Sequence, residues 1–133
     1  MRGRMGHMPE FLIGFSFHEP EPFAQWQRGL IEDYESSTGI WITADNHREA
    51  LAWAEQVAQA VHRRVNNDPS ADWREAGHFC WLEESPTQSG WTHCLSFFQH
   101  VGVGEMPPLE EMGTDAYDRW QKSTQPGPAK EQK

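Results

Sequence analysis

The segment from Gly39 to Val65 constrains the fold of this chain more than any other part of the sequence. Its first residues, GIWIT, favour a strand because they are mostly β-branched or aromatic. From Ala50 onward, apolar residues recur every three or four positions, which is the period of a helix with one buried stripe. Asn46 and Glu49 lie between the two parts at the spacing of a capping box. The segment therefore predicts a strand, a tight capped turn and one helix over residues 46–65.

Two segments before this unit have less certain patterns. Residues 11–17, FLIGFSF, are rich in β-formers and predict a strand, which the prolines of HEPEP end. Residues 22–36 fit either a short helix through Trp26 or one irregular helix. With the first alternative we expect a strand around Leu30–Glu35 that turns at SSTG into the next strand, since Ser, Thr and Gly are typical turn residues.

The second half of the chain predicts a β-hairpin. Residues 78–84, HFCWLEE, and residues 91–101, WTHCLSFFQHV, are two apolar runs joined by the turn-forming segment SPTQSG. TDAYDRWQK, from Thr114 onward, predicts a short C-terminal helix capped by that threonine. The expected fold class is α+β, with an antiparallel sheet of four to five strands, one long helix packed on one face and the short C-terminal helix.

The length of 133 residues predicts one domain with one core. We expect residues 1–8 to form a disordered leader, residues 9–122 a single α+β domain and residues 123–133 a disordered polar tail. Met1, Met5 and Met8 are alternative start positions. The basic and apolar N-terminal segment lacks a small-residue cleavage site, so we expect no signal peptide and a cytoplasmic protein.

The charge of the chain bears on the class of partner. The formal net charge is −9, and residues 9–122 carry seven basic and 19 acidic side chains. An acidic body repels phosphate, so nucleic acid is excluded as a partner, whereas a basic protein is favoured. No apolar run approaches the length of about 18 residues that a membrane span needs, so we expect no membrane partner.

The histidines and cysteines of the predicted hairpin are the candidate metal ligands. His78 and Cys80 share one strand face, but His93 and Cys94 point to opposite faces, so at most three of these side chains can converge. The sequence has no C-x-x-C or H-E-x-x-H spacing, and we expect no metal and no cofactor. If a metal is bound, the expected ligands are His78, Cys80 and His93.

The remaining histidines and cysteines are expected to have ordinary structural roles. His7, His47 and His62 are predicted to face solvent. Cys80 and Cys94 lie about equally far from the hairpin centre and could face each other, but a reducing compartment favours two small buried thiols. No G-x-S-x-G segment or other nucleophile arrangement is present, so we expect no catalytic residue and no enzyme.

Tryptophan and acidic residues suggest a binding surface. Trp73 and Trp91 lie in predicted loops, where a large ring is hard to bury completely, and Glu83 and Glu84 lie nearby on the predicted hairpin. Exposed aromatic rings beside charges are typical of protein-binding hot spots. We therefore predict that Trp73, Trp91, Glu83 and Glu84 contact a protein partner.

The unit GIWITADNHREALAWAEQVAQAV resembles the strand–turn–helix of HicB-like antitoxin domains, with Glu49, Ala50 and Leu51 matching their EAL triplet. The glycine-rich PGC segment of that family is absent, and no DNA-binding tail follows. The chain also resembles small bacterial immunity-type and uncharacterised α+β domains. The resemblance implies a bacterial, non-enzymatic protein that neutralises a basic toxin or nuclease.

Two other function classes stay open from the sequence. One is a small metal- or ligand-dependent enzyme that uses the His-rich hairpin, which a pair of clustered buried histidines would favour. The other is a homodimeric accessory domain whose sheet edge pairs with a second copy.

Overall fold

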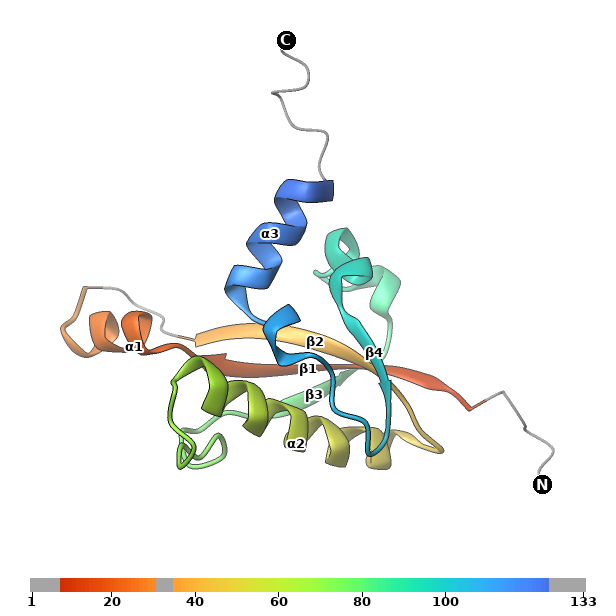
Figure 1. Cartoon of the computed structure of the whole chain (residues 1–133). Coiled ribbons are helices and arrows are strands. Elements are labelled where there is room, and N and C mark those ends of the chain that lie inside the picture. Colours follow the sequence, from red (N-terminus) through yellow and green to blue (C-terminus); the bar gives the residue numbers. More distant parts are fainter. Residues whose placement is uncertain (1–7, 31–34, 125–133) are drawn as a thin grey trace, which may run out of the picture.

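A four-stranded sheet with the order β3-β1-β2-β4 forms the centre of the fold (Figure 1). The computed structural model describes residues 8–30 and 35–124. β1 (Glu10–His18) pairs antiparallel with both β2 (Glu35–Thr43) and β3 (Cys80–Glu83), whereas β4 (Gln99–Gly102) runs parallel to β2. The predicted α+β class is therefore confirmed, and β4 makes the sheet mixed rather than wholly antiparallel.

Each face of the sheet is covered by a different part of the chain. The long helix α2 (His47–Val65) crosses one face, and α3 (Thr114–Thr124) lies on the opposite side together with the segment before β4 (Figure 1). A short helix, α1 (Pro20–Gln27), follows β1 directly, and Pro20 suits its first position because a first-turn residue needs no backbone N–H. The described chain also has 3₁₀ turns at Pro86–Gln88, Thr92–Phe97 and Leu109–Glu111.

Coverage on both faces explains the burial of β1. Six consecutive residues, Leu12 to Phe17, are buried, although strand side chains alternate between faces. Ile13, Phe15 and Phe17 belong to the core beneath α2, whereas Leu12 packs with aromatic residues on the other face. That second cluster contains Cys94, Phe97, Phe98 and Ala116, with Trp41, Trp91, Leu95, Tyr117 and Trp120 partly buried around it.

The predicted turn and helix after β2 are confirmed. Asn46 is the N-cap of α2, and its side-chain oxygen accepts a hydrogen bond from the Glu49 amide at 3.0 Å. Leu51 is only half-buried, because it lies at the margin of the stripe that faces the sheet. The buried residues of α2 are Ala50, Ala54, Val57, Ala58, Val61 and His62.

The predicted turn at SSTG is wrong. Those residues lie inside β2, where an unbroken ladder pairs every residue from Glu35 to Thr43 with β1. The ladder satisfies the backbone groups of this polar segment, so pairing overrides its turn propensity. In the segment 22–36, the helix through Trp26 is confirmed as part of α1, whereas the strand predicted from Leu30 falls mostly on residues 31–34, outside the described residues.

The predicted hairpin of residues 78–84 and 91–101 is also wrong. β3 and β4 lie at opposite edges of the sheet, and 3₁₀ turns carry the chain between them across one face. The apolar residues of this connection, Trp91, Cys94, Leu95, Phe97 and Phe98, recur at mixed spacings of one to three rather than at the strand period of two. They pack onto the sheet face as a layer instead of pairing with β3.

The short C-terminal helix is confirmed as α3, which begins at Thr114. The predicted leader and tail, residues 1–8 and 123–133, fall largely on residues 1–7 and 125–133, which lie outside the described residues. Among the helices that the structure describes, none combines the length and apolar character needed to cross a membrane.

Candidate metal centre

Three histidines from distant parts of the chain converge where β1 meets the end of α2. His18 ends β1, His62 lies in the last turn of α2 and His78 precedes β3. One ring nitrogen of each lies within 4.8 Å of one ring nitrogen of both others. His62 and His78 are 3% and 4% exposed, and His18 is half-buried. The prediction that His62 faces solvent is therefore wrong.

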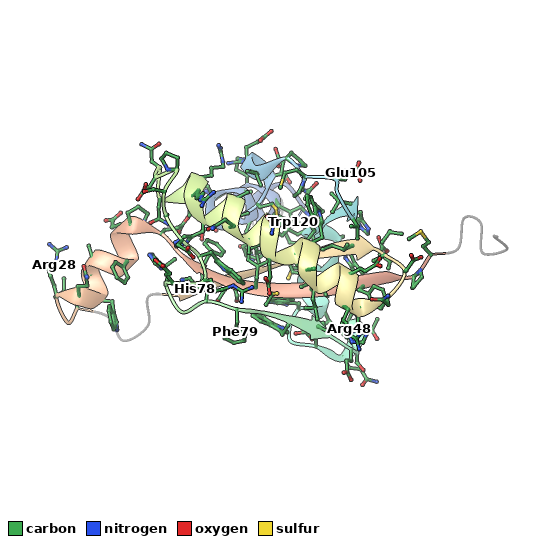
Figure 2. All side chains as sticks on the ribbon, turned by 90° about the horizontal axis from the view of Figure 1, so that it is seen from below. Arg28, Arg48, His78, Phe79, Glu105 and Trp120 are labelled. Atoms are coloured by element: carbon green, nitrogen blue, oxygen red, sulfur yellow. The ribbon has the colours of Figure 1, made fainter. Side chains whose placement is uncertain are left out.

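Local structure accounts for the position of each ring. His62 continues the buried stripe of α2 at a spacing of four from Ala58, so the helix points it toward the sheet. Gly77 has a φ of +87°, a left-handed conformation that turns the chain inward just before His78. His78 is buried while its neighbour Phe79 projects outward, and Figure 2 shows the two side by side.

Hydrogen bonds connect two of the rings directly. Nδ1 of His18 lies 2.9 Å from Nε2 of His78, so one of these nitrogens carries the proton that the other accepts. Nδ1 of His78 lies 3.1 Å from Oγ of Ser16. The ring of His62 lies nearly perpendicular to that of His18, with 4.8 Å between ring centroids. His78 is thus held at both nitrogens, one by a histidine and one by a hydroxyl.

A second layer of contacts fixes the backbone around the three rings. Nδ2 of Asn66, at the C-cap of α2, donates to the backbone oxygens of His18 and His62, both at 2.9 Å. The indole Nε1–H of Trp73 donates to the backbone oxygen of Ser16 at 2.7 Å. These bonds tie the ends of β1 and α2 together and anchor the loop that leads to His78.

The environment holds all three imidazoles in the neutral form. The pKa of His78 is lowered to about 4, mainly by burial and to a smaller extent by the nearby His18 and His62. Burial is also the main cause of the lowered pKa of His62, with a smaller contribution from His18. Burial lowers the pKa of His18 as well. Neutral imidazole is the form that binds metal, because each bond uses a nitrogen lone pair.

The spacing of the histidine nitrogens is close to the spacing of nitrogen ligands around a metal ion. Zinc–nitrogen bonds of about 2.0–2.1 Å in a tetrahedral arrangement separate ligand nitrogens by about 3.3 Å. The 2.9 Å separation of the His18 and His78 nitrogens is close to that value. Ser16 is placed to accept the remaining N–H of His78, as second-layer residues do for histidine ligands.

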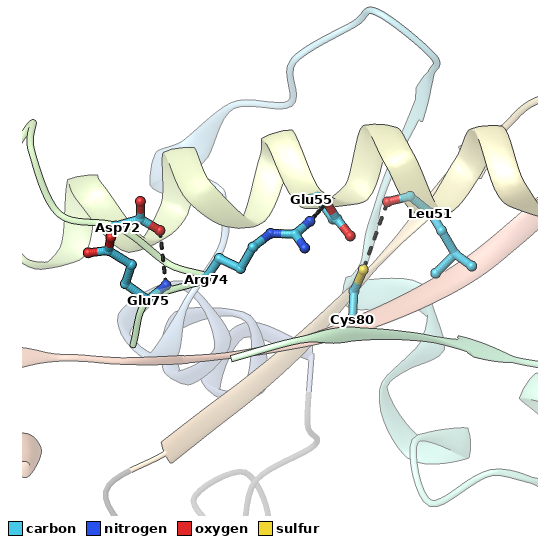
Figure 3. A network of polar contacts seen from close by, with 6 residues as sticks. All are labelled: Leu51, Glu55, Asp72, Arg74, Glu75 and Cys80. Atoms are coloured by element: carbon cyan, nitrogen blue, oxygen red, sulfur yellow. Dashed lines mark hydrogen bonds and ion pairs between the residues drawn. The ribbon is translucent and has the colours of Figure 1, made fainter. Parts of the chain in front are cut away.

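Of the metal ligands expected from sequence, only His78 belongs to this cluster. The Cys80 thiol lies 3.8 Å from the backbone oxygen of Leu51, beneath α2 (Figure 3). His93 is exposed on the 3₁₀ turn at the other face. The expected ligand set does not converge, because the hairpin that would have brought it together does not form. Cys80 and Cys94 are free thiols in different clusters.

Of the four residues predicted to contact a partner, only Glu84 is exposed. Trp73 is 3% exposed, because its ring is buried in the core under α2 and its N–H reaches Ser16. Trp91 is half-buried. Glu83 is half-buried and accepts a hydrogen bond from the indole of Trp81 at 2.8 Å, whereas Glu84 is exposed. Trp73 is thus unsuited to anchor a partner.

Three features of the structure are absent from the sequence predictions, and the burial of His62 is the one that a sequence pattern indicates. His62 keeps the spacing of the buried stripe, so its burial was available from the helical period. Phe79 is 60% exposed, and the predicted surface aromatic residues do not include it. His18 begins the HEPEP segment that ends the first predicted strand, and no local pattern indicates that it meets His62 and His78.

Comparisons with protein-family models, with curated protein sequences and with solved structures found no match. The resemblance to HicB-like domains therefore stays a prediction.

Proposed function

We propose that this protein binds a divalent transition-metal ion through His18, His62 and His78. The observation that supports the proposal is the convergence of three imidazole nitrogens within 4.8 Å, with two of the rings buried. The proposal replaces the expectation of no metal, which depended on ligands in the hairpin alone.

Packing alone is a poor explanation for three histidines in this place. Burying a polar ring costs free energy unless its nitrogens are paired, and an apolar side chain would fill the same space without that cost. The bonds to His18 and Ser16 pair both nitrogens of His78, and the imidazole of His62 lies close to the same point. A cation bound by all three rings would explain why they converge.

The donor set selects the class of metal. Neutral imidazole nitrogens suit zinc, nickel, copper and related ions, whereas calcium and magnesium prefer oxygen donors. Three protein ligands leave one tetrahedral position for water or a substrate, as in zinc sites that activate water. This favours the metal-dependent class of function among those considered from sequence.

Metal titration of the full chain tests the proposal. We expect isothermal titration calorimetry of chelator-treated protein to give one zinc ion per chain. We also expect cobalt to give the visible spectrum of a tetrahedral nitrogen site. His62→Ala and His78→Ala should each weaken zinc binding at least about tenfold, since each removes one of three ligands.

His93→Ala and Cys80→Ser are the matched controls, because they remove the ligands expected from sequence while leaving the cluster intact. Zinc binding that survives in His62→Ala and His78→Ala but is lost in these controls would overturn the proposal. Absence of stoichiometric binding in the wild-type protein would do the same.

A second candidate function is the binding of a basic protein, as expected from sequence. It is favoured by the edge patch, which we define as Phe79, Trp81, Glu83 and Glu84 on and beside β3. The exposed ring of Phe79 contacts the Trp81 ring at 5.6 Å between centroids, and two carboxylates follow: Glu83 at the end of the outer strand β3 and Glu84 directly after it. The net charge of −9 would attract a basic partner and speed its association.

Binding kinetics with a basic partner distinguish this candidate. Phe79→Ala should speed dissociation, and higher salt should slow association. Val103→Ala, at an exposed apolar position outside the patch, is the control and should change neither rate. Salt-independent rates, or equal effects of the two substitutions, would remove the candidate.

A further inference from the structure

A cavity of about 360 Å³ lies on the sheet face opposite α2. Its walls come from four parts of the chain: Phe17 of β1, β2, the 3₁₀ segment that precedes β4 with the residues just before it, and the start of α3 with Gly113. The volume falls at the lower end of the range of about 300–1,000 Å³ that is typical of small-molecule sites. The cavity is separate from the three histidines, none of which lines it.

Aromatic rings dominate the cavity walls. Trp91 and Phe98 contact each other edge to face, with 5.0 Å between centroids, and Phe97 and Tyr117 do so at 5.4 Å. All four rings line the cavity. Because rings that are already packed against each other lose little freedom on binding, they form a preorganised surface for a flat apolar ligand.

The polar groups of the cavity are hydroxyls, the Cys94 thiol and the imidazole of His93. Ser37, Thr38 and Thr114 line it, and each hydroxyl can donate or accept a hydrogen bond. Burial raises the pKa of the Cys94 thiol, which therefore stays neutral. Among the described residues that line the cavity, none is Asp, Glu, Lys or Arg, although the chain as a whole has a net charge of −9.

We propose that this cavity binds a small, uncharged, planar aromatic molecule that carries a hydroxyl or similar hydrogen-bonding group. The rings of Trp91 and Phe97 contact its faces and edges, and the hydroxyls of Thr38 and Thr114 orient its polar group. A charged ligand would lose its hydration, and no Asp, Glu, Lys or Arg among the described lining residues could pair with it. The site does not depend on metal binding at the histidine cluster.

Three ring compounds of similar size and different charge test the proposal: phenol, benzoate and benzylamine. The readout is the indole N–H resonance of Trp91 in ¹H–¹⁵N NMR spectra of the full chain, assigned with Trp91→Phe. We expect phenol to shift this resonance saturably with a millimolar Kd, as befits so small a ligand. Benzoate and benzylamine should bind at least about tenfold more weakly.

Matched substitutions locate the binding site. Ser37→Phe places a ring at a residue that lines the cavity and should weaken phenol binding at least about tenfold, whereas Ser96→Phe, at an exposed residue that does not line it, should leave binding unchanged. Gly90→Phe is a second blocking variant, since a Cβ there meets no atom within 4 Å.

Several results would overturn the proposal. These are no saturable shift with phenol, equal binding of the charged compounds, and loss of binding in Ser96→Phe alone. Loss of zinc binding in His62→Ala with unchanged phenol binding would show that the two sites are independent, as we expect. Phenol binding lost in His62→Ala as strongly as in Ser37→Phe would contradict the separate cavity site.

Discussion

The indole ring of Trp81 on β3 lies directly over Gly14 on β1. A Cβ atom at Gly14 would lie 2.5 Å from Cε2 of the Trp81 ring, much closer than real contacts allow. The ring is also held by the hydrogen bond from its Nε1 to Glu83 at 2.8 Å, so it cannot easily move aside. Glycine at position 14 is therefore what allows an indole to seal this face of the sheet.

We predict that Gly14→Ala destabilises the protein by about 1–3 kcal/mol, because the added methyl group overpacks a rigid ring. Urea denaturation followed by tryptophan fluorescence measures the change. Gly90→Ala is the control, since a Cβ there meets no atom within 4 Å, and its effect should stay below about 0.5 kcal/mol. Equal stability of Gly14→Ala and the wild type would show that the ring can relax.

Removal of the cap of α2 has a calculable cost. Asn46→Ala loses the acceptor for the Glu49 amide, and we expect a loss of about 0.5–2 kcal/mol in the free energy of unfolding. Asn46→Ser retains a capping oxygen and should remain within a few tenths of a kcal/mol of the wild type. Chemical denaturation checks both variants, and similar losses for Ala and Ser would argue against the hydrogen bond as the cause.

The hydroxyl of Ser16 should matter for metal affinity more than for folding. It lies 3.1 Å from Nδ1 of His78 and orients the ring whose other nitrogen would bind metal. We expect Ser16→Ala to weaken zinc binding by about 10–100-fold, as second-layer changes do. Ser96→Ala, at an exposed serine, is the control for calorimetry. Unchanged zinc affinity in Ser16→Ala would mean that this bond does not orient the ligand.

The reactivity of Cys80 should depend steeply on pH. Burial, with a smaller contribution from Glu55, raises the pKa of this thiol from 9.0 to about 11. Because only the thiolate reacts, alkylation of native Cys80 at pH 8 should be roughly 100-fold slower than in urea-unfolded protein. The rate should rise about tenfold per pH unit until the pKa is approached.

Peptide mapping after timed treatment with iodoacetamide measures the Cys80 rate separately from that of Cys94. The raised pKa also makes the stability of the fold depend on pH. Above pH 9 the thiol loses its proton in the unfolded chain before it does so in the folded chain, so the free energy of unfolding should fall as pH rises toward 11. Equal native and unfolded alkylation rates at pH 8 would contradict the burial of the thiol.

The parts of the fold that depend on residues close together in the sequence were predictable, whereas the parts that depend on distant segments were not. The strand, cap and helix of Gly39–Val65 were predictable because the helical period and the bond between Asn46 and Glu49 are contiguous in sequence. Strand pairing was not predictable, because the β-forming residues in 91–101 do not specify which segment they contact. The packing of Phe97 and Phe98 on the sheet face decided their structure.

The sequence by itself determined the α+β class, the capped helix and the apolar stripe along that helix. Only the tertiary structure decided that β3 pairs with β1, that β4 runs parallel to β2, and that His18 and His78 meet His62. The physical reason is that local periodicity fixes which face of an element is buried, whereas the partner of that face is selected among distant segments. Three residues spaced 44 and 16 positions apart in the chain carry no local sign of their convergence.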